Sequence, residues 1–265
     1  MVQPFTHSLH NHSYNMIPQP FVKGAGDRVF FAPYEYPSGA DIVFDFGNPL
    51  CTSAFGSNIV YNVGSLNVTG SLIPYNNPTP VYPTLTTRAG GVMVTRYIET
   101  IDSGSYLQWS GVTTEDVTIV VCSALNGEQT PSGLSATPNV IGKNSIDIEV
   151  RSTAALVYIE PDTGGRTILF NDTIYDTSTS NGRDGFNMIG VTSNGSDFHQ
   201  YYKNNILIYN NFPLPNYTKP TSATQTFQLG VQSNLGVQCY LQYPKILRAK
   251  EIRQIYKVFS QRFFT

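Results

Sequence analysis

Residues 225–265 combine a strand pattern with one amphipathic helix, and this combination limits the fold more than any other feature of the sequence. Phe227 and Leu229 alternate with Gln228, as in a strand with one buried face. Further on, apolar residues recur at three- and four-residue spacing among charged ones: Ile246, Leu247, Ile252, Ile255, Tyr256 and Phe259. This spacing predicts a short helix over residues 248–263 that lies on a larger body.

Short apolar runs separated by turn residues fill the rest of the chain from residue 41 onward. The candidate strands are residues 41–46, 58–63, 91–100, 105–110, 116–125, 145–151, 155–160, 166–172, 186–193, 198–205, 206–211, 226–231 and 237–243. Gly, Asn and Asp cluster between several of them, as in residues 161–165 and 178–185. Many short strands with little helix predict an all-β fold, an antiparallel two-sheet jelly-roll sandwich closed by one short C-terminal helix.

The first 38 residues differ from this body. Their apolar residues follow no sustained periodicity. They hold three of the four histidines and five prolines (Pro4, Pro18, Pro20, Pro33 and Pro37). We predict an extended N-terminal arm over residues 1–38 and one jelly-roll domain over residues 39–265. A disordered tail is the alternative, but aromatic residues such as Phe5, Tyr14 and Phe21 favour an arm that buries them against a neighbouring subunit.

Composition excludes several classes of function. The formal net charge is −2 and only 13% of residues are charged, so we expect no binding to nucleic acid. No apolar stretch is long enough to insert into a membrane, and the N-terminus lacks the pattern of a secretory signal. The sequons that begin at Asn11, Asn67, Asn171, Asn194 and Asn216 are therefore expected to be unmodified. A surface of uncharged polar groups, which this composition indicates, is typical of proteins that pack into assemblies or are exposed outside cells.

The two ends of the body resemble the laminin-G-like, or concanavalin A-like, jelly roll of phage and other viral structural proteins. At the closing end, the residues that carry the resemblance are Tyr243, Ile246, Leu247, Glu251, Ile252 and Tyr256. At the opening end, residues 41–73 resemble the first strands of such domains, and the Gly90-Gly91 pair stands where these domains have one. In the hairpin at residues 188–211, Asn205 replaces the family's glycine. The acidic segment that usually follows the glycine pair is missing, so a calcium site is not implied.

Residues suited to catalysis are scarce. Related jelly-roll glycosidases carry paired carboxylates, and the nearest approach here is Asp147 with Glu149, which we interpret as the exposed face of an ordinary strand. His199 stands alone in a strand without a nucleophile motif. We predict no catalytic residue and no cofactor. A divergent glycan-degrading enzyme, dependent on Glu149, stays an open alternative.

Metal and redox chemistry also lack a clear signal. His7, His10 and His12 lie close together, but no Cys or acidic residue completes a site in one chain, so we interpret them as incidental and predict no metal site. Cys51, Cys122 and Cys239 are widely spaced and odd in number, which indicates reduced, buried thiols.

Aromatic residues remain the best candidates for contacts with a ligand or another subunit. The candidates are Trp109, Tyr75, Tyr82, Tyr201, Tyr202 and Tyr217, although each also suits a core. We predict a non-enzymatic virion component, a capsid-decorating or tail-fibre surface protein that is assembled in the host cytoplasm. Its expected partners are other virion subunits and copies of itself. The alternative is a lectin-like module that binds host surface glycans.

Overall fold

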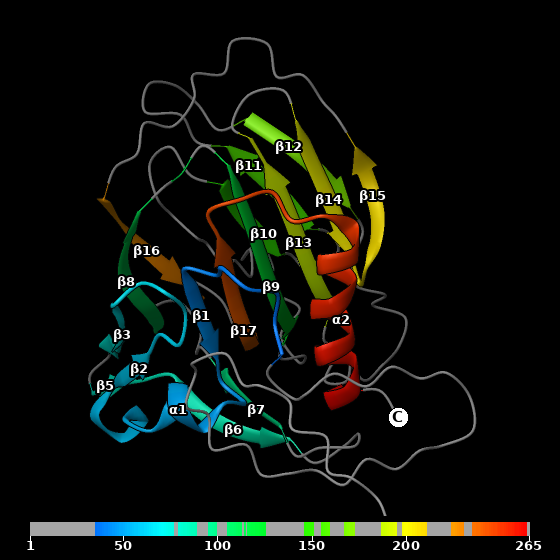
Figure 1. Cartoon of the computed structure of the whole chain (residues 1–265). Coiled ribbons are helices and arrows are strands. Elements are labelled where there is room, and N and C mark those ends of the chain that lie inside the picture. Colours follow the sequence, from blue (N-terminus) through cyan, green and yellow to red (C-terminus); the bar gives the residue numbers. More distant parts are fainter. Residues whose placement is uncertain are drawn as a thin grey trace, which may run out of the picture. The chain divides into compact units, whose positions relative to one another are not determined.

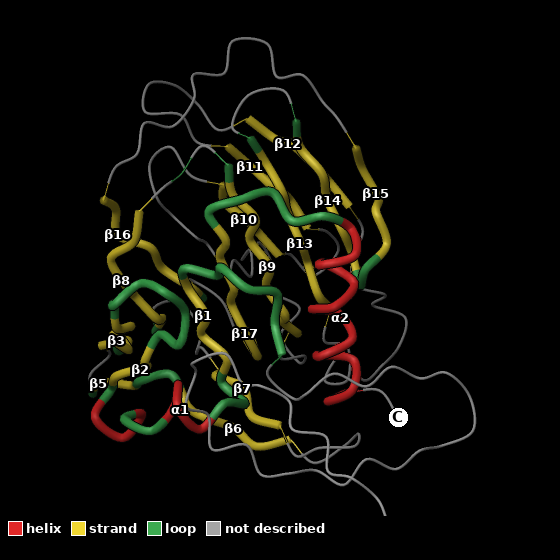
Figure 2. Tube along the Cα trace, viewed as in Figure 1, coloured by secondary structure: helices red, strands yellow, loops and turns green. Residues whose placement is uncertain are grey.

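The computed structural model describes residues 35–76, 79–88, 95–99, 105–112, 114, 116–125, 146–150, 155–159, 167–172, 187–194, 198–210, 224–230 and 235–263. All of them belong to one compact unit, Phe31–Thr265. Strands make up most of the described elements, and the two α-helices among them are short (Figure 2). The predicted arm lies outside the described residues except for residues 35–38, so it stays a prediction.

The larger sheet has eight strands. Seven follow the order β15-β14-β13-β9-β17-β7-β6, and β1 also pairs with β17 (Figure 1). Their bounds are β1 (Ile42–Asp45), β6 (Thr84–Arg88), β7 (Thr95–Glu99), β9 (Val117–Leu125), β13 (Asn187–Ser193), β14 (His199–Lys203), β15 (Ile206–Asn210) and β17 (Leu235–Tyr243). Because neighbours in this order are often far apart in sequence, the sheet depends on long-range pairing.

The second layer is a four-stranded sheet in the order β16-β8-β3-β2. Its strands are β2 (Ile59–Tyr61), β3 (Thr69–Ile73), β8 (Tyr106–Val112) and β16 (Thr224–Leu229). A three-stranded sheet contains β10 (Ile146–Val150), β11 (Ala155–Ile159) and β12 (Thr167–Asp172), and a small hairpin contains β4 (Tyr75–Asn76) and β5 (Pro80–Val81). The described strand pairs are antiparallel throughout.

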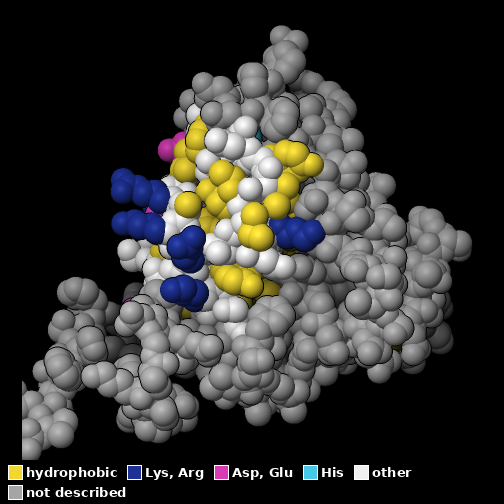
Figure 3. Space-filling model, turned by 90° about the vertical axis from the view of Figure 1, so that its right-hand side faces the viewer, with side chains coloured by type: hydrophobic (Ala, Val, Ile, Leu, Met, Phe, Trp, Pro, Cys, Tyr) yellow, Lys and Arg dark blue, Asp and Glu magenta, His cyan; other side chains and the backbone are white. Residues whose placement is uncertain are grey.

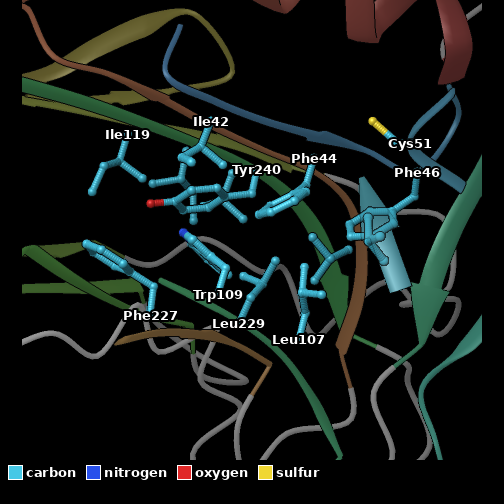
Figure 4. Packing of buried hydrophobic residues seen from close by; sticks show 14 of the residues in the cluster. Ile42, Phe44, Phe46, Cys51, Leu107, Trp109, Ile119, Phe227, Leu229 and Tyr240 are labelled. Carbon is cyan, nitrogen blue, oxygen red and sulfur yellow. The ribbon is translucent and has the colours of Figure 1, made fainter. Parts of the chain in front are cut away.

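The core lies between the eight-stranded and four-stranded sheets. Trp109 on β8 stacks on Phe227 of β16, with ring centroids 5.6 Å apart, and meets Phe44 of β1 edge-on at 5.1 Å. The ring of Tyr240 from β17 lies 4.9 Å from the same indole, so residues from both sheets meet at one point (Figure 4). A Cβ atom at Gly111 would lie 2.6 Å from Phe227, and glycine there leaves room for the stack.

Helix α2 (Ala249–Phe263) covers the other face of the eight-stranded sheet (Figure 1). Strand alternation explains how one sheet serves two layers: Ile119 and Val121 face the core between the sheets, whereas Val120 and Cys122 face the helix. At its N-terminus the helix is capped by Glu251, whose carboxylate accepts a hydrogen bond from the Arg248 backbone N–H at 2.8 Å.

The architecture predicted from sequence is confirmed: the protein is an all-β antiparallel jelly-roll sandwich with a C-terminal helix. Two features differ from the prediction. Strands β3 to β6 fall in residues outside the candidate strands, and a four-residue helix, α1 (Pro49–Thr52), precedes β2. The three cysteines are buried thiols that form no disulfide, as expected.

Candidate functional site

Three of the six candidate aromatic residues are part of the interior. Trp109, Tyr201 and Tyr202 are buried, the first two in the core between the sheets and the third beneath α2. Their rings cannot reach a glycan, so the interpretation of these three as exposed binding residues is wrong and the alternative, packing, is right. Hydrophobic burial of large aromatic surfaces is the physical reason. Tyr217 lies outside the described residues.

The remaining two candidates lie on one hairpin. Tyr75 is on β4 and pairs with Val81 of β5, and Tyr82 follows directly. Tyr82 is 36% exposed and Tyr75 is partly exposed. Pro80, which is exposed, pairs with Asn76 and so completes the hairpin. The structure thus places two tyrosines of the predicted set on one hairpin, in a Pro- and Asn-rich segment.

This hairpin, residues 75–82, joins the two layers of the sandwich. On one side it follows β3, whose Leu72 is buried in the core. On the other side it leads through the buried Pro83 into β6, whose Leu85 packs against the same core. Both ends are therefore anchored, and the conformational entropy lost when a ligand orders the hairpin is reduced.

Five other large apolar side chains are exposed and were not among the candidates, three of them on β15 and two elsewhere. Tyr61 on β2 is 42% exposed and Leu50 on α1 is 47% exposed. Strand β2 is an edge strand of the four-stranded sheet, and for this reason the ring of Tyr61, the last residue of β2, reaches solvent. Position at a sheet edge depends on strand order, and the sequence carries no direct signal of it.

The sequence suggested that His199 stands alone in a strand, but in the structure it has a polar partner on the neighbouring strand. It pairs with Ser193 across β13 and β14, and the serine Oγ lies 2.8 Å from the histidine Nδ1. Both side chains are buried. A substrate carbonyl cannot approach a serine enclosed in this way, so the pair is a structural hydrogen bond between neighbouring strands.

Acidic and metal-binding groups provide no alternative centre in the part of the chain that the structure describes. Asp45 is buried and accepts hydrogen bonds from the Tyr36 hydroxyl and the Gly47 N–H, which makes it a structural acid. Groups of three or more His, Cys, Asp or Glu that could hold a metal ion do not occur among the described residues.

Several predicted groups fall outside this description. The side chains of Asp147 and Glu149 lie outside it, as do His7, His10 and His12. The predictions made for these five residues therefore stay predictions. Among the described helices, none is long and apolar enough to cross a membrane.

No protein-family model and no curated protein matches the sequence. Solved structures of similar fold do exist. The crystal structure of the botulinum neurotoxin serotype D binding domain matches with a TM-score of 0.62 and 12% identity, over 83% of this chain and 51% of that chain. A second structure concerns botulinum neurotoxin type C, whose cell entry depends on interaction with two ganglioside molecules; its TM-score is 0.59 at 14% identity, over 82% and 50% of the chains.

The binding domain of botulinum neurotoxin DC in complex with SialylT matches with a TM-score of 0.59 and 13% identity, over 82% of this chain and 51% of that chain. The present chain thus spans about half the length of these domains. The likeness shows the fold, a jelly-roll β-sandwich of the kind found in receptor-binding domains. It does not extend to the viral family that the sequence resembles.

Proposed function

We propose that the protein is a non-enzymatic carbohydrate-binding module that recognises cell-surface glycans through the hairpin of residues 75–82. The observation that carries the proposal is the exposure of Tyr82 on the hairpin that also carries Tyr75 and is anchored at both ends in the core. Of the three functions considered from the sequence, glycan binding gains support from the fold, because solved structures that share it include a toxin domain in complex with SialylT.

The chemistry of the hairpin suits a sugar. A tyrosine ring offers a flat apolar face to the C–H groups of a pyranose and a hydroxyl that donates or accepts a hydrogen bond. Tyrosine also loses little rotamer entropy on binding, since it has two side-chain torsions. The hairpin carries two tyrosines with Asn76 and Pro80 between them in sequence and no charged residue, which favours a neutral ligand surface over a charged one.

The proposal is tested on a glycan array with the full chain and two variants. We expect Tyr82→Ala to weaken binding of the best glycan at least tenfold, because the variant removes the most exposed ring of the hairpin. Tyr61→Ala is the matched control: it removes a ring of similar exposure from β2, outside the hairpin, and should leave affinity unchanged.

Three outcomes would contradict the proposal: no glycan bound by the wild-type chain, equal loss in both variants, or loss only in Tyr61→Ala. Thermal unfolding of each variant shows whether its fold is intact. Trp109→Ala is unsuitable here, because removal of a buried indole would destabilise the core and abolish binding indirectly.

A virion structural role is the second candidate, favoured by the low content of charged residues and by the exposed apolar strand described below. It is compatible with glycan binding, since a surface protein of a particle can do both. The test is whether antibody against the protein labels intact particles; labelling absent from every particle fraction would exclude it.

A further inference from the structure

Strand β15 exposes three successive aliphatic side chains. Ile206 is 62% exposed, Leu207 42% and Ile208 38%. They make up half of the large hydrophobic residues that are exposed in the described part of the chain. Such a run is unfavourable on a free surface, and in natural proteins it marks an interaction site or an aggregation site.

The position of β15 adds to this exposure. It is the terminal strand of the eight-stranded sheet, and among the described strands it pairs with β14 alone. Edge strands are usually protected by charged residues, proline or bulges; β15, with the sequence ILIYN, has no charged residue and no proline, and its irregularity is confined to Ile208. Figure 3 shows the side of the molecule that carries α2 and β15, where hydrophobic side chains gather between Lys and Arg side chains.

The strand is nevertheless held firmly in place. Asn204 and Asn205 form the turn before it, and both have positive φ, 47° and 74°, as the tight hairpin turn requires. The side chain of Asn204 accepts a hydrogen bond from the Met188 N–H at 2.8 Å. At the other end, the Gln200 amide donates to the Asn210 side chain at 2.9 Å. The exposed apolar edge is therefore built into the fold.

We propose that β15 is the contact by which two copies of this chain associate, strand against strand, about a two-fold axis at Leu207. In this arrangement Leu207 lies opposite Leu207 of the second copy, and Ile206 lies opposite Ile208. The two eight-stranded sheets become continuous. The inference is independent of the proposed glycan binding, which uses a different hairpin.

A second copy suits this edge better than an unlike partner. The residues around Leu207 read Ile-Leu-Ile, the same in both directions, so antiparallel pairing places an aliphatic side chain against an aliphatic one in each copy. The strand is uncharged, so self-pairing brings no like charges together along it, and it offers no charge by which an unlike partner would be selected.

The contact should be weak. Ile208 forms a bulge, because Leu207 pairs with Tyr202 and Tyr209 pairs with Tyr201, which limits regular pairing to a few residues. Small interfaces correspond to weak association, so we expect a dissociation constant on the order of 10 μM or above. High salt should not dissociate the dimer, since the contact is apolar.

Disulfide trapping tests the register directly. Leu207→Cys introduces one accessible thiol, because Cys51, Cys122 and Cys239 are buried. Opposite residues of antiparallel strands have Cα atoms about 4.5–5.5 Å apart, within the range for a disulfide. Under mild oxidation we expect Leu207→Cys to form covalent dimers at least tenfold faster than Leu50→Cys, a control with similar exposure on α1.

Sedimentation of the wild-type chain and of Ile206→Lys, from about 1 μM to about 300 μM, brackets an interface of this size. We expect the wild type to dimerise within this range and Ile206→Lys to stay monomeric, with Leu50→Lys behaving as wild type. A wild type that stays monomeric throughout, or equal trapping rates at residues 207 and 50, would overturn the proposal. Ile206 is exposed, so its substitution should leave folding intact.

Discussion

At the scale of single residues, alternation decides which aromatic side chains are available to a ligand. On β8, Leu107, Trp109 and Gly111 face the core, whereas Gln108 and Ser110 point away. The same alternation is visible in the sequence, and it indicates that Trp109 shares the face of Leu107. On β14 alternation directs Tyr201 to the core between the sheets and Tyr202 to α2, and both are buried because the sheet is covered on both faces.

Buried hydroxyl groups give a prediction on stability. The hydroxyl of Tyr243 is buried without a hydrogen-bond partner in the part of the chain that the structure describes. We expect Tyr243→Phe to raise the free energy of unfolding by about 1 kcal/mol at neutral pH, because an unsatisfied polar atom is removed. Tyr240→Phe should lower it, since the Tyr240 hydroxyl donates to Gln242 at 2.9 Å. Urea denaturation of both variants shows whether each substitution raises or lowers the free energy of unfolding. A destabilised Tyr243→Phe would contradict the argument.

The same tyrosines give a prediction on pH. Burial raises the pKa of Tyr243, and the nearby Cys239 and Glu251 raise it further; burial also raises the pKa of Tyr240 and Tyr202. Because the folded-state pKa is the higher one, stability is retained below about pH 10 and lost as pH rises from there toward the folded-state pKa, by up to about 1.4 kcal/mol per pH unit for a tyrosine that stays protonated in the fold. Tyr243→Phe should make this loss less steep. Equal slopes for the variant and the wild type would show that Tyr243 does not titrate with unfolding.

At the scale of elements, those with a regular apolar period or a continuous apolar run could be predicted from the sequence, and the others could not. Helix α2 has a clear apolar period, β8 alternates, and β9 and β13 contain continuous apolar runs; all four form where expected. Strands β3 and β6 read TGSLI and TLTTR, with few apolar residues, and they form because β8 and β7 supply partners. Tertiary pairing overrides weak local preference in such segments.

The cap of α2 gives a prediction at this scale. Glu251 accepts a hydrogen bond from the Arg248 N–H at 2.8 Å and lies 3.5 Å from Lys245 Nζ. We expect Glu251→Ala to lower the free energy of unfolding by about 1 kcal/mol and Glu251→Gln to cost less, since glutamine keeps an acceptor. Arg253→Ala, at an exposed position of the same helix, is the control. Equal effects of Glu251→Ala and Arg253→Ala in urea denaturation would show that the cap contributes nothing specific.

At the scale of the whole molecule, the sequence was enough to predict the β-sandwich but not to predict which strands and hairpins lie on its surface. The two-layer all-β architecture follows from many short strands and one helix, and the structure confirms it. The exposed edge of β15 and the anchoring of the hairpin at residues 75–82 depend on strand order, which long-range pairing determines. Of the candidate aromatic residues, only Tyr75 and Tyr82 are described near the surface.

The most direct test of glycan recognition by this hairpin is an NMR titration of the isotope-labelled chain with the best-bound glycan from the array. We predict that backbone shifts change at Tyr75, Val81 and Tyr82, and that those of Tyr61 and Leu50 stay constant. Shift changes that cluster on another surface, or none at saturating glycan, would contradict the proposed function.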